Sequence, residues 1–74
     1  MSALASTPQE IAARVRDERK RQGLDQRTVA MIANVGVRSV HRVEQGEATV
    51  RFDIVLRVLA ALGLEVSIRS RADP

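Results

Sequence analysis

The fold is decided by residues 25–46, which read DQRTVAMIANVGVRSVHRVEQG. Asp25 is a good N-cap, because its carboxylate can accept from the first free backbone N–H groups of a helix over Gln26–Ala33. Asn34 follows, and asparagine is the residue other than glycine that most readily takes the left-handed conformation. A second helix is predicted over Val37–Gln45 and closed by Gly46. Two short helices joined by residues 34–36 are typical of a helix-turn-helix.

The second of these helices has two distinct faces. At 100° per residue, Val40 and Val43 fall on one side and Glu44 lies next to them. The opposite side carries no acid. It combines arginines, which can make bidentate contacts to guanine, with a valine that can touch a thymine methyl group, and this suits a major groove. The predicted base-contacting residues are Val37, Arg38, His41 and Arg42. The alternative interpretation is that the arginines are ordinary surface charges.

Two further helices flank this pair. One is predicted to begin with Thr7 as N-cap and Pro8 as its first residue, and to stop at Gln22, with Gly23 in the left-handed position that follows. The last helix is predicted over Phe52–Leu62, with an inward stripe formed by Phe52, Val55, Leu56, Leu59 and Leu62. We therefore expect an all-α domain over residues 7–63, a strand over 64–69, and flexible tails over 1–6 and 70–74.

Self-association is predicted from two features. The last helix has a second apolar row besides its core stripe, and a helix that is apolar nearly all round must be buried nearly all round. Residues 64–69 alternate apolar and polar as a strand does, and a lone strand invites pairing with its own copy about a two-fold axis. The predicted dimer interface comprises Ile54, Val58, Ala61, Leu64, Val66 and Ile68. The alternative is a monomer in which residues 64–69 are a frayed tail.

Composition narrows the class of function. The chain has 74 residues, no cysteine and one histidine, and a net charge of +3 from twelve Lys and Arg against nine acids. Neither a metal site, a cofactor nor an enzymatic residue set is expected, whereas a basic excess suits a polyanion. No apolar run is long enough for a membrane span, so a cytoplasmic, nucleoid-associated protein is expected. The residues expected to contact DNA phosphates are Gln26, Arg27, Ser39, Thr49 and Arg51.

From Ile11 to Leu62 the chain resembles the Cro and phage-repressor class of helix-turn-helix regulators, also called the xenobiotic-response-element family. The residues that carry the resemblance are Arg14, Arg19, Gly23-Leu24-Asp25-Gln26, Val29-Ala30, Val35, Val40, Val43-Glu44-Gln45-Gly46, Leu56 and Leu59-Ala60-Ala61-Leu62-Gly63. The resemblance implies an all-α domain of four or five helices whose third helix enters the major groove of double-stranded DNA. It also implies a structural ion pair between Arg19 and Glu44.

Three positions depart from the family pattern. Asp25 stands where Thr or Ser is usual, Asn34 where the turn glycine is usual, and Gly36 where a Ser or Thr normally caps the reading helix. The glycine weakens that cap by a few tenths of a kcal/mol, roughly the difference measured for such replacements. It also leaves the N-terminus of the helix more open to a phosphate.

The C-terminal segment Leu62-Gly63-Leu64-Glu65-Val66-Ser67-Ile68 resembles the HipB-type antitoxins. This resemblance implies a homodimer whose terminal strands pair, a palindromic operator, repression of its own toxin–antitoxin operon, and a HipA-type kinase toxin as partner. The alternatives are a stand-alone or phage-type regulator, and an interaction module that mainly neutralises a toxin.

Overall fold

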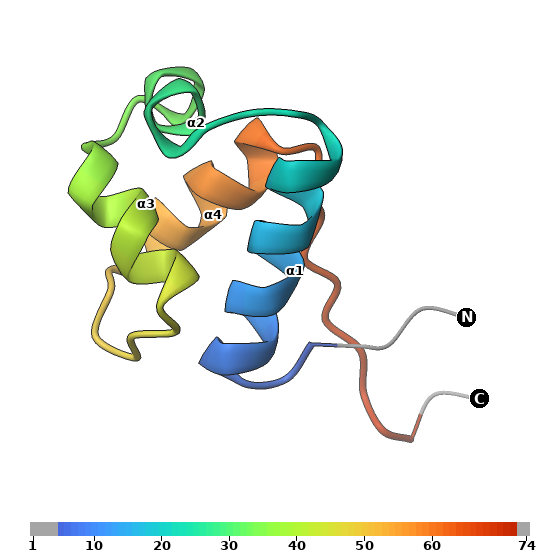
Figure 1. Cartoon of the computed structure of the whole chain (residues 1–74). Helices are drawn as coiled ribbons and strands as arrows, with labels where there is room; N and C mark the ends of the chain where they lie inside the picture. Colours follow the sequence, from blue (N-terminus) through green and yellow to red (C-terminus); the bar gives the residue numbers. More distant parts are fainter. Residues whose placement is uncertain (1–4, 73–74) are drawn as a thin grey trace.

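The computed structural model describes residues 5–72, and these residues form four helices. They are α1 (Pro8–Arg21), α2 (Gln26–Ala33), α3 (Val37–Glu44) and α4 (Phe52–Ala61) (Figure 1). Each predicted helix is confirmed, with its ends within one residue of the prediction. The parts of the expected tails at residues 1–4 and 73–74 lie outside the described residues.

The helices begin and end where local chemistry requires. The backbone N–H of Glu10 donates to Thr7 Oγ1 over 3.1 Å at the start of α1, and the N–H of Thr28 donates to Asp25 Oδ1 over 2.8 Å at the start of α2. Asn34 has the left-handed φ of 57° that the turn needs. These contacts satisfy backbone groups that the helix interior leaves unpaired.

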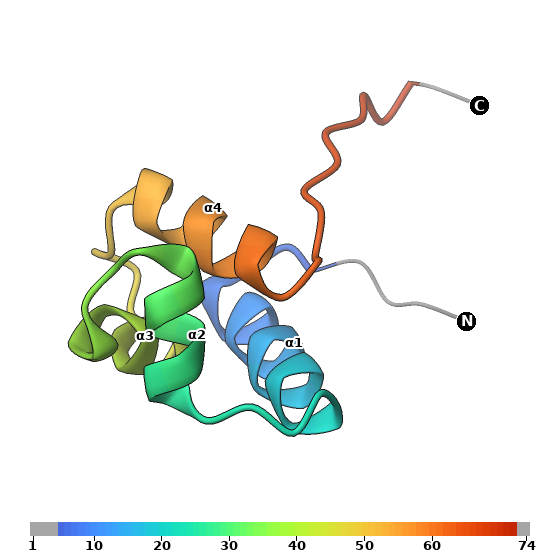
Figure 2. The ribbon, with the colours of Figure 1, turned by 90° about the horizontal axis from the view of Figure 1, so that it is seen from above.

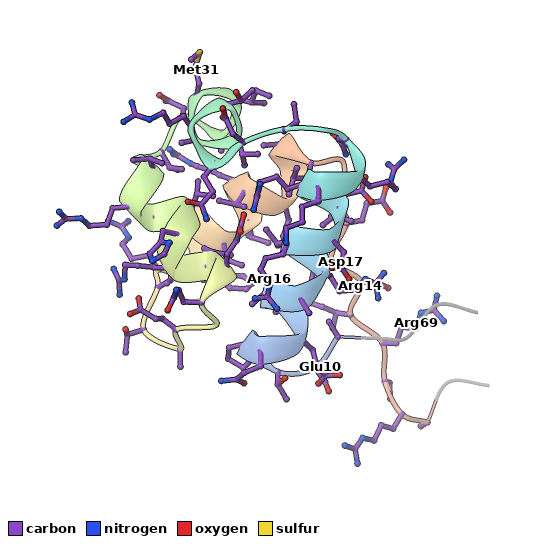
Figure 3. All side chains as sticks on the ribbon, viewed as in Figure 1. Glu10, Arg14, Arg16, Asp17, Met31 and Arg69 are labelled. Carbon is purple, nitrogen blue, oxygen red and sulfur yellow. The ribbon has the colours of Figure 1, made fainter. Side chains whose placement is uncertain are left out.

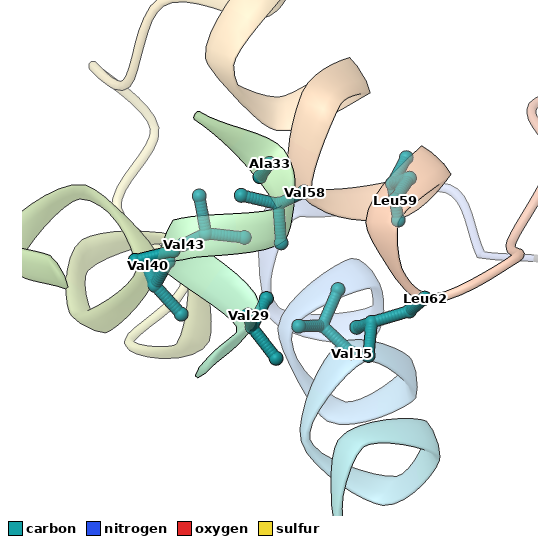
Figure 4. Close-up of a cluster of buried hydrophobic side chains, with 9 residues drawn as sticks. Val15, Val29, Ala33, Val40, Val43, Val58, Leu59 and Leu62 are labelled. Atoms are coloured by element: carbon teal, nitrogen blue, oxygen red, sulfur yellow. The ribbon is translucent and has the colours of Figure 1, made fainter. Parts of the chain in front are cut away.

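The core is assembled from one wholly buried valine per helix: Val15, Val29, Val40 and Val58. Figure 4 shows these side chains meeting between the four helices. The other buried members of the cluster are Ala30, Ala33, Val43, Leu59 and Leu62. Because each helix contributes to the same core, the orientation of α3 depends on all three other helices.

Helix α4 is rotated relative to the prediction. Val58, which we expected at a dimer interface, is 0% exposed, so the expectation is wrong for this residue. Phe52 and Leu56, expected in the core, are 68% and 37% exposed. Only Asp53 and Arg57 mark a solvent side on α4, so the sequence defines its orientation weakly and packing sets it.

Residues 64–70 have no regular secondary structure, so the strand predicted over 64–69 is not formed within the described range 5–72. Figure 2 shows this segment extending away from the helices. Leu64 packs on the core, whereas Val66 and Ile68 are 50% and 92% exposed. Within the described range, no helix has the length and apolar character needed to cross a membrane.

Candidate nucleic-acid interface

Helix α3 lies at the edge of the molecule, packed against α1 and α2 (Figures 1 and 2). Val40 and Val43 face the core, while Val37, Arg38 and His41 are exposed. The N-cap residue Gly36 supplies no side-chain hydrogen bond to the helix. The outer face of α3 is therefore apolar and basic, with an open N-terminus, as the sequence predicted.

A buried carboxylate fixes α3 against α1. Glu44 is 5% exposed, and its two carboxylate oxygens accept from Arg19 Nε over 2.6 Å and from Arg19 Nη2 over 3.0 Å. The hydrogen bond to Glu44 raises the pKa of Arg19, so this guanidinium stays charged. Arg16, which points from α1 toward the end of α3 in Figure 3, donates to the Glu44 backbone carbonyl. The expected ion pair is therefore present.

The same carboxylate orients the start of α2. Gln26 Nε2 donates to Glu44 Oε1 over 3.2 Å. Arg27, one residue further along, is exposed. The Glu44 carboxylate thus connects α3 to α1 through Arg19 and to α2 through Gln26. These bonds fix the start of α2, where the two predicted phosphate-contacting residues of that helix lie.

The structure places the remaining expected phosphate contacts on α3 and in the loop that follows it. Ser39 is half-buried in the first turn of α3, and Thr49 is exposed in the loop. Arg51 is exposed at the start of α4, where its Nε lies 3.1 Å from Asp53 Oδ1. Ser39 therefore lies on α3 itself, whereas Thr49 and Arg51 lie in the segment between α3 and α4.

Arg42 is held in a way that the sequence reasoning missed. Its Nε donates to Glu47 Oε2, and its Nη2 donates to Thr49 Oγ1 over 3.2 Å. Both acceptors belong to the loop after α3. A signal for this contact exists in the sequence, because Gly46 reverses the chain at the end of the helix and returns the next residue toward Arg42.

The described residues contain no group of three or more His, Cys, Asp or Glu side chains arranged for a metal ion. The surface around α3 offers Arg guanidinium groups, an amide, hydroxyl groups and a helix N-terminus. Such groups match phosphate oxygens and the edges of bases.

Comparison with known proteins agrees with this geometry. Residues 10–72 match the family model described as a helix-turn-helix domain. The chain is 40% identical over 68 residues to the uncharacterised HTH-type transcriptional regulator y4mF of Sinorhizobium fredii (strain NBRC 101917 / NGR234), covering 92% of this chain and 90% of that protein.

Among solved structures, a chain from a complex of a HipB variant with an O2 20mer superposes with a TM-score of 0.86. The superposition covers 96% of this chain and 99% of the other, at 14% sequence identity, and so establishes a shared fold. The residue patterns, the geometry of α2 and α3 and these matches lead to one conclusion: the chain belongs to the helix-turn-helix family of DNA-binding transcription regulators.

Proposed function

We propose that this chain is a homodimeric repressor that binds a palindromic operator through α3 and regulates its own toxin–antitoxin operon. The observation that carries the DNA-binding part is the outer face of α3. Val37, Arg38 and His41 are exposed there, and α3 itself contributes no acid to that face; Glu47, which pairs with Arg42, belongs to the loop that follows. A bidentate contact from Arg38 to a guanine would contribute about 1–3 kcal/mol of base discrimination.

Two groups of residues on this surface have different roles in DNA binding. Arg38, for which the described chain offers no hydrogen-bond or ion-pair partner, reads bases with Val37, His41 and Arg42. Gln26, Arg27, Ser39, Thr49 and Arg51 contact phosphates. Phosphate contacts release counterions, so affinity falls about 10³-fold or more between about 50 and 200 mM salt.

Dimerisation is supported by the exposed apolar surface of α4 and the C-terminal segment. Phe52, Leu56 and Ala60 recur at helical spacing along the exposed face of α4. With Val66 and Ile68 exposed on an extended segment, the chain leaves both an apolar row and unpaired backbone in water. A second copy would cover both. Ile54, Ala61 and Leu64, which are half-buried, border this surface in the proposal, and Val58 is removed from it.

A DNA-binding assay on two arginine variants tests the reading head. In fluorescence anisotropy with the gene's own promoter, Arg38→Ala should lower affinity for the promoter toward that for scrambled DNA. Arg51→Ala should weaken promoter and scrambled DNA by the same factor, because phosphates carry no sequence. Equal behaviour of the two variants would contradict the assignment of Arg38. A folded wild type that binds no DNA at low salt would overturn the function itself.

Solution mass tests the dimer. Leu56→Glu should yield a monomer, whereas Met31→Glu, at a side chain that is 79% exposed on α2 and points away from the core (Figure 3), should leave the dimer intact. Removal of residues 64–74 measures the contribution of the terminal segment. A wild type that is monomeric at assay concentrations would refute the homodimer.

The antitoxin role is supported by the resemblance of Leu62–Ile68 to the HipB-type segment and by the shared fold with HipB. Co-expression with the adjacent gene tests it. Co-purification with a kinase-like product whose toxicity the chain suppresses is the expected result. A DNA-binding dimer with no such partner would instead be a stand-alone regulator.

A further inference from the structure

We propose that Glu47, assisted by Thr49, is a positioning residue that sets which edge of the Arg42 guanidinium meets DNA. This inference rests on the proposed function, in which Arg42 reads a base. Its starting point is the pair of loop contacts to Arg42, from Nε to the Glu47 carboxylate and from Nη2 to Thr49 Oγ1 over 3.2 Å.

The two contacts occupy one edge of a planar group. In a guanidinium the N–H of Nε and one N–H of Nη2 point along the same edge, while Nη1 and the second hydrogen of Nη2 form another. With Nε and Nη2 engaged by the loop, the Nη1–Nη2 edge of Arg42 has no acceptor within the described chain. That edge is a complete two-donor fork, the arrangement that pairs with O6 and N7 of guanine.

The position of Glu47 follows from how α3 ends. The N–H of Gly46 donates to the Val43 carbonyl over 3.1 Å, and the N–H of Glu47 donates to the Arg42 carbonyl over 3.2 Å. This is the Schellman arrangement, in which the second residue beyond the cap lies beside the third residue from the end of the helix. Glu47 and Arg42 are therefore neighbours by backbone geometry, independently of their charges.

The other helices show that a charged pair is a departure at this position. A backbone bond of the same kind ends each of the other helices: the neighbours are Arg19 and Leu24 at α1, Ala30 and Val35 at α2, and Leu59 and Leu64 at α4. At least one member of each pair is apolar, as is usual for the motif, and none of the three is an ion pair. At α3 the two residues instead form an ion pair, and one of them is a predicted base-reading residue.

Neither attraction to DNA nor folding stability accounts for a glutamate at position 47. Glu47 sits on a surface proposed to meet a polyanion, where one negative charge weakens the attraction for every DNA sequence alike. Its pair with Arg42 is exposed, at 41% and 46% for the two side chains, so the pair contributes little to folding. A glutamate at position 47 is accounted for if it lowers the affinity for all DNA but holds the Arg42 guanidinium in a defined orientation.

Selection from a random duplex library of about 30 base pairs, long enough for two half-sites, tests the inference with the intact chain. The library is sequenced before and after one round of binding, and base preference is obtained at each position. Arg42→Ala identifies the positions that depend on Arg42. Glu47→Ala should weaken preference at those same positions by about two- to fivefold, the range that exposed ion pairs contribute, and should leave the others unchanged.

Two variants separate orientation from charge. Asp53→Ala removes an acid from a similar exposed pair, with Arg51, and should raise affinity for all sequences without changing base preference. Glu47→Gln keeps an acceptor for Nε and should retain more of the preference than Glu47→Ala. If Glu47→Ala alters no position, or alters all of them as a uniform factor like Asp53→Ala, the inference is overturned. No enrichment by the folded wild type would refute the proposed function instead.

Discussion

Replacing Arg19 with Met tests the connection between α1 and α3 most directly. Met preserves most of the stem packing but removes both donors to Glu44, whose side chain is only 4% exposed. The carboxylate then keeps Gln26 Nε2, at 3.2 Å, as its remaining side-chain donor. Leaving one member of a buried pair without its partner costs about 3–5 kcal/mol. Because Gln26 persists, we expect the lower end, about 3 kcal/mol.

That loss is large for a domain of this size, whose free energy of unfolding is of the order of 4–11 kcal/mol. Urea unfolding followed by the helical circular dichroism signal measures it. With a slope of about 1 kcal/mol per molar urea, the midpoint of Arg19→Met should fall by about 3 M. The measurement should be made at fixed protein concentration, since dimerisation shifts the midpoint as well.

Arg21→Met is the matched control. Arg21 is also on α1 and pairs with a glutamate, Glu18, but its side chain is 71% exposed and the pair is of the surface kind. Its midpoint should stay close to that of the wild type. The double variant Arg19→Met/Glu44→Met should recover much of the loss, because no charge remains buried. Equal midpoints for Arg19→Met and Arg21→Met would refute the reasoning.

Three further perturbations have defined outcomes. Because a hydrogen bond from the α2 backbone lowers the pKa of Asp25, the stability advantage of the wild type over Asp25→Asn should be present at neutral pH and disappear as the pH falls through that lowered value, as acid titration of unfolding would show. Gly46→Ala should lower the thermal midpoint more than Gly63→Ala: both have φ above +70°, but only at Gly46 would the new Cβ meet the α1 backbone, at 3.3 Å, and equal losses would contradict this. Val58→Ala should destabilise by about 2–3 kcal/mol at any protein concentration, whereas Leu56→Ala should mainly reduce the concentration dependence of the midpoint; the reverse pattern would contradict the orientation of α4.

Much of the fold and the exposed face of α3 follow from local signals. Thr7 and Asp25 act within one turn of their own helices, and Asn34 adopts the conformation that its short polar side chain favours. The outer face of α3 was predictable because core-facing valines and polar residues fall on opposite faces of that helix. Arg38 and His41 are exposed for this reason.

The remaining features depend on contacts between distant segments. Phe52 and Val58 are both apolar and both lie on α4, and only packing against the other helices decides that Val58 is buried while Phe52 is exposed. The loop contact of Arg42 is different, because it joins residues only five and seven positions apart, and its geometry depends on how the chain turns after Gly46.

The sequence by itself therefore determined the four helices, their ends and the outer face of α3, because caps, turns and amphipathic periodicity act over a few neighbouring residues. Tertiary structure alone decided which side of α4 remains exposed. The turn directly after α3 decided which edge of the Arg42 guanidinium remains open. The physical reason is that the burial of an apolar side chain on α4 is set by partners on other helices, which local periodicity does not specify.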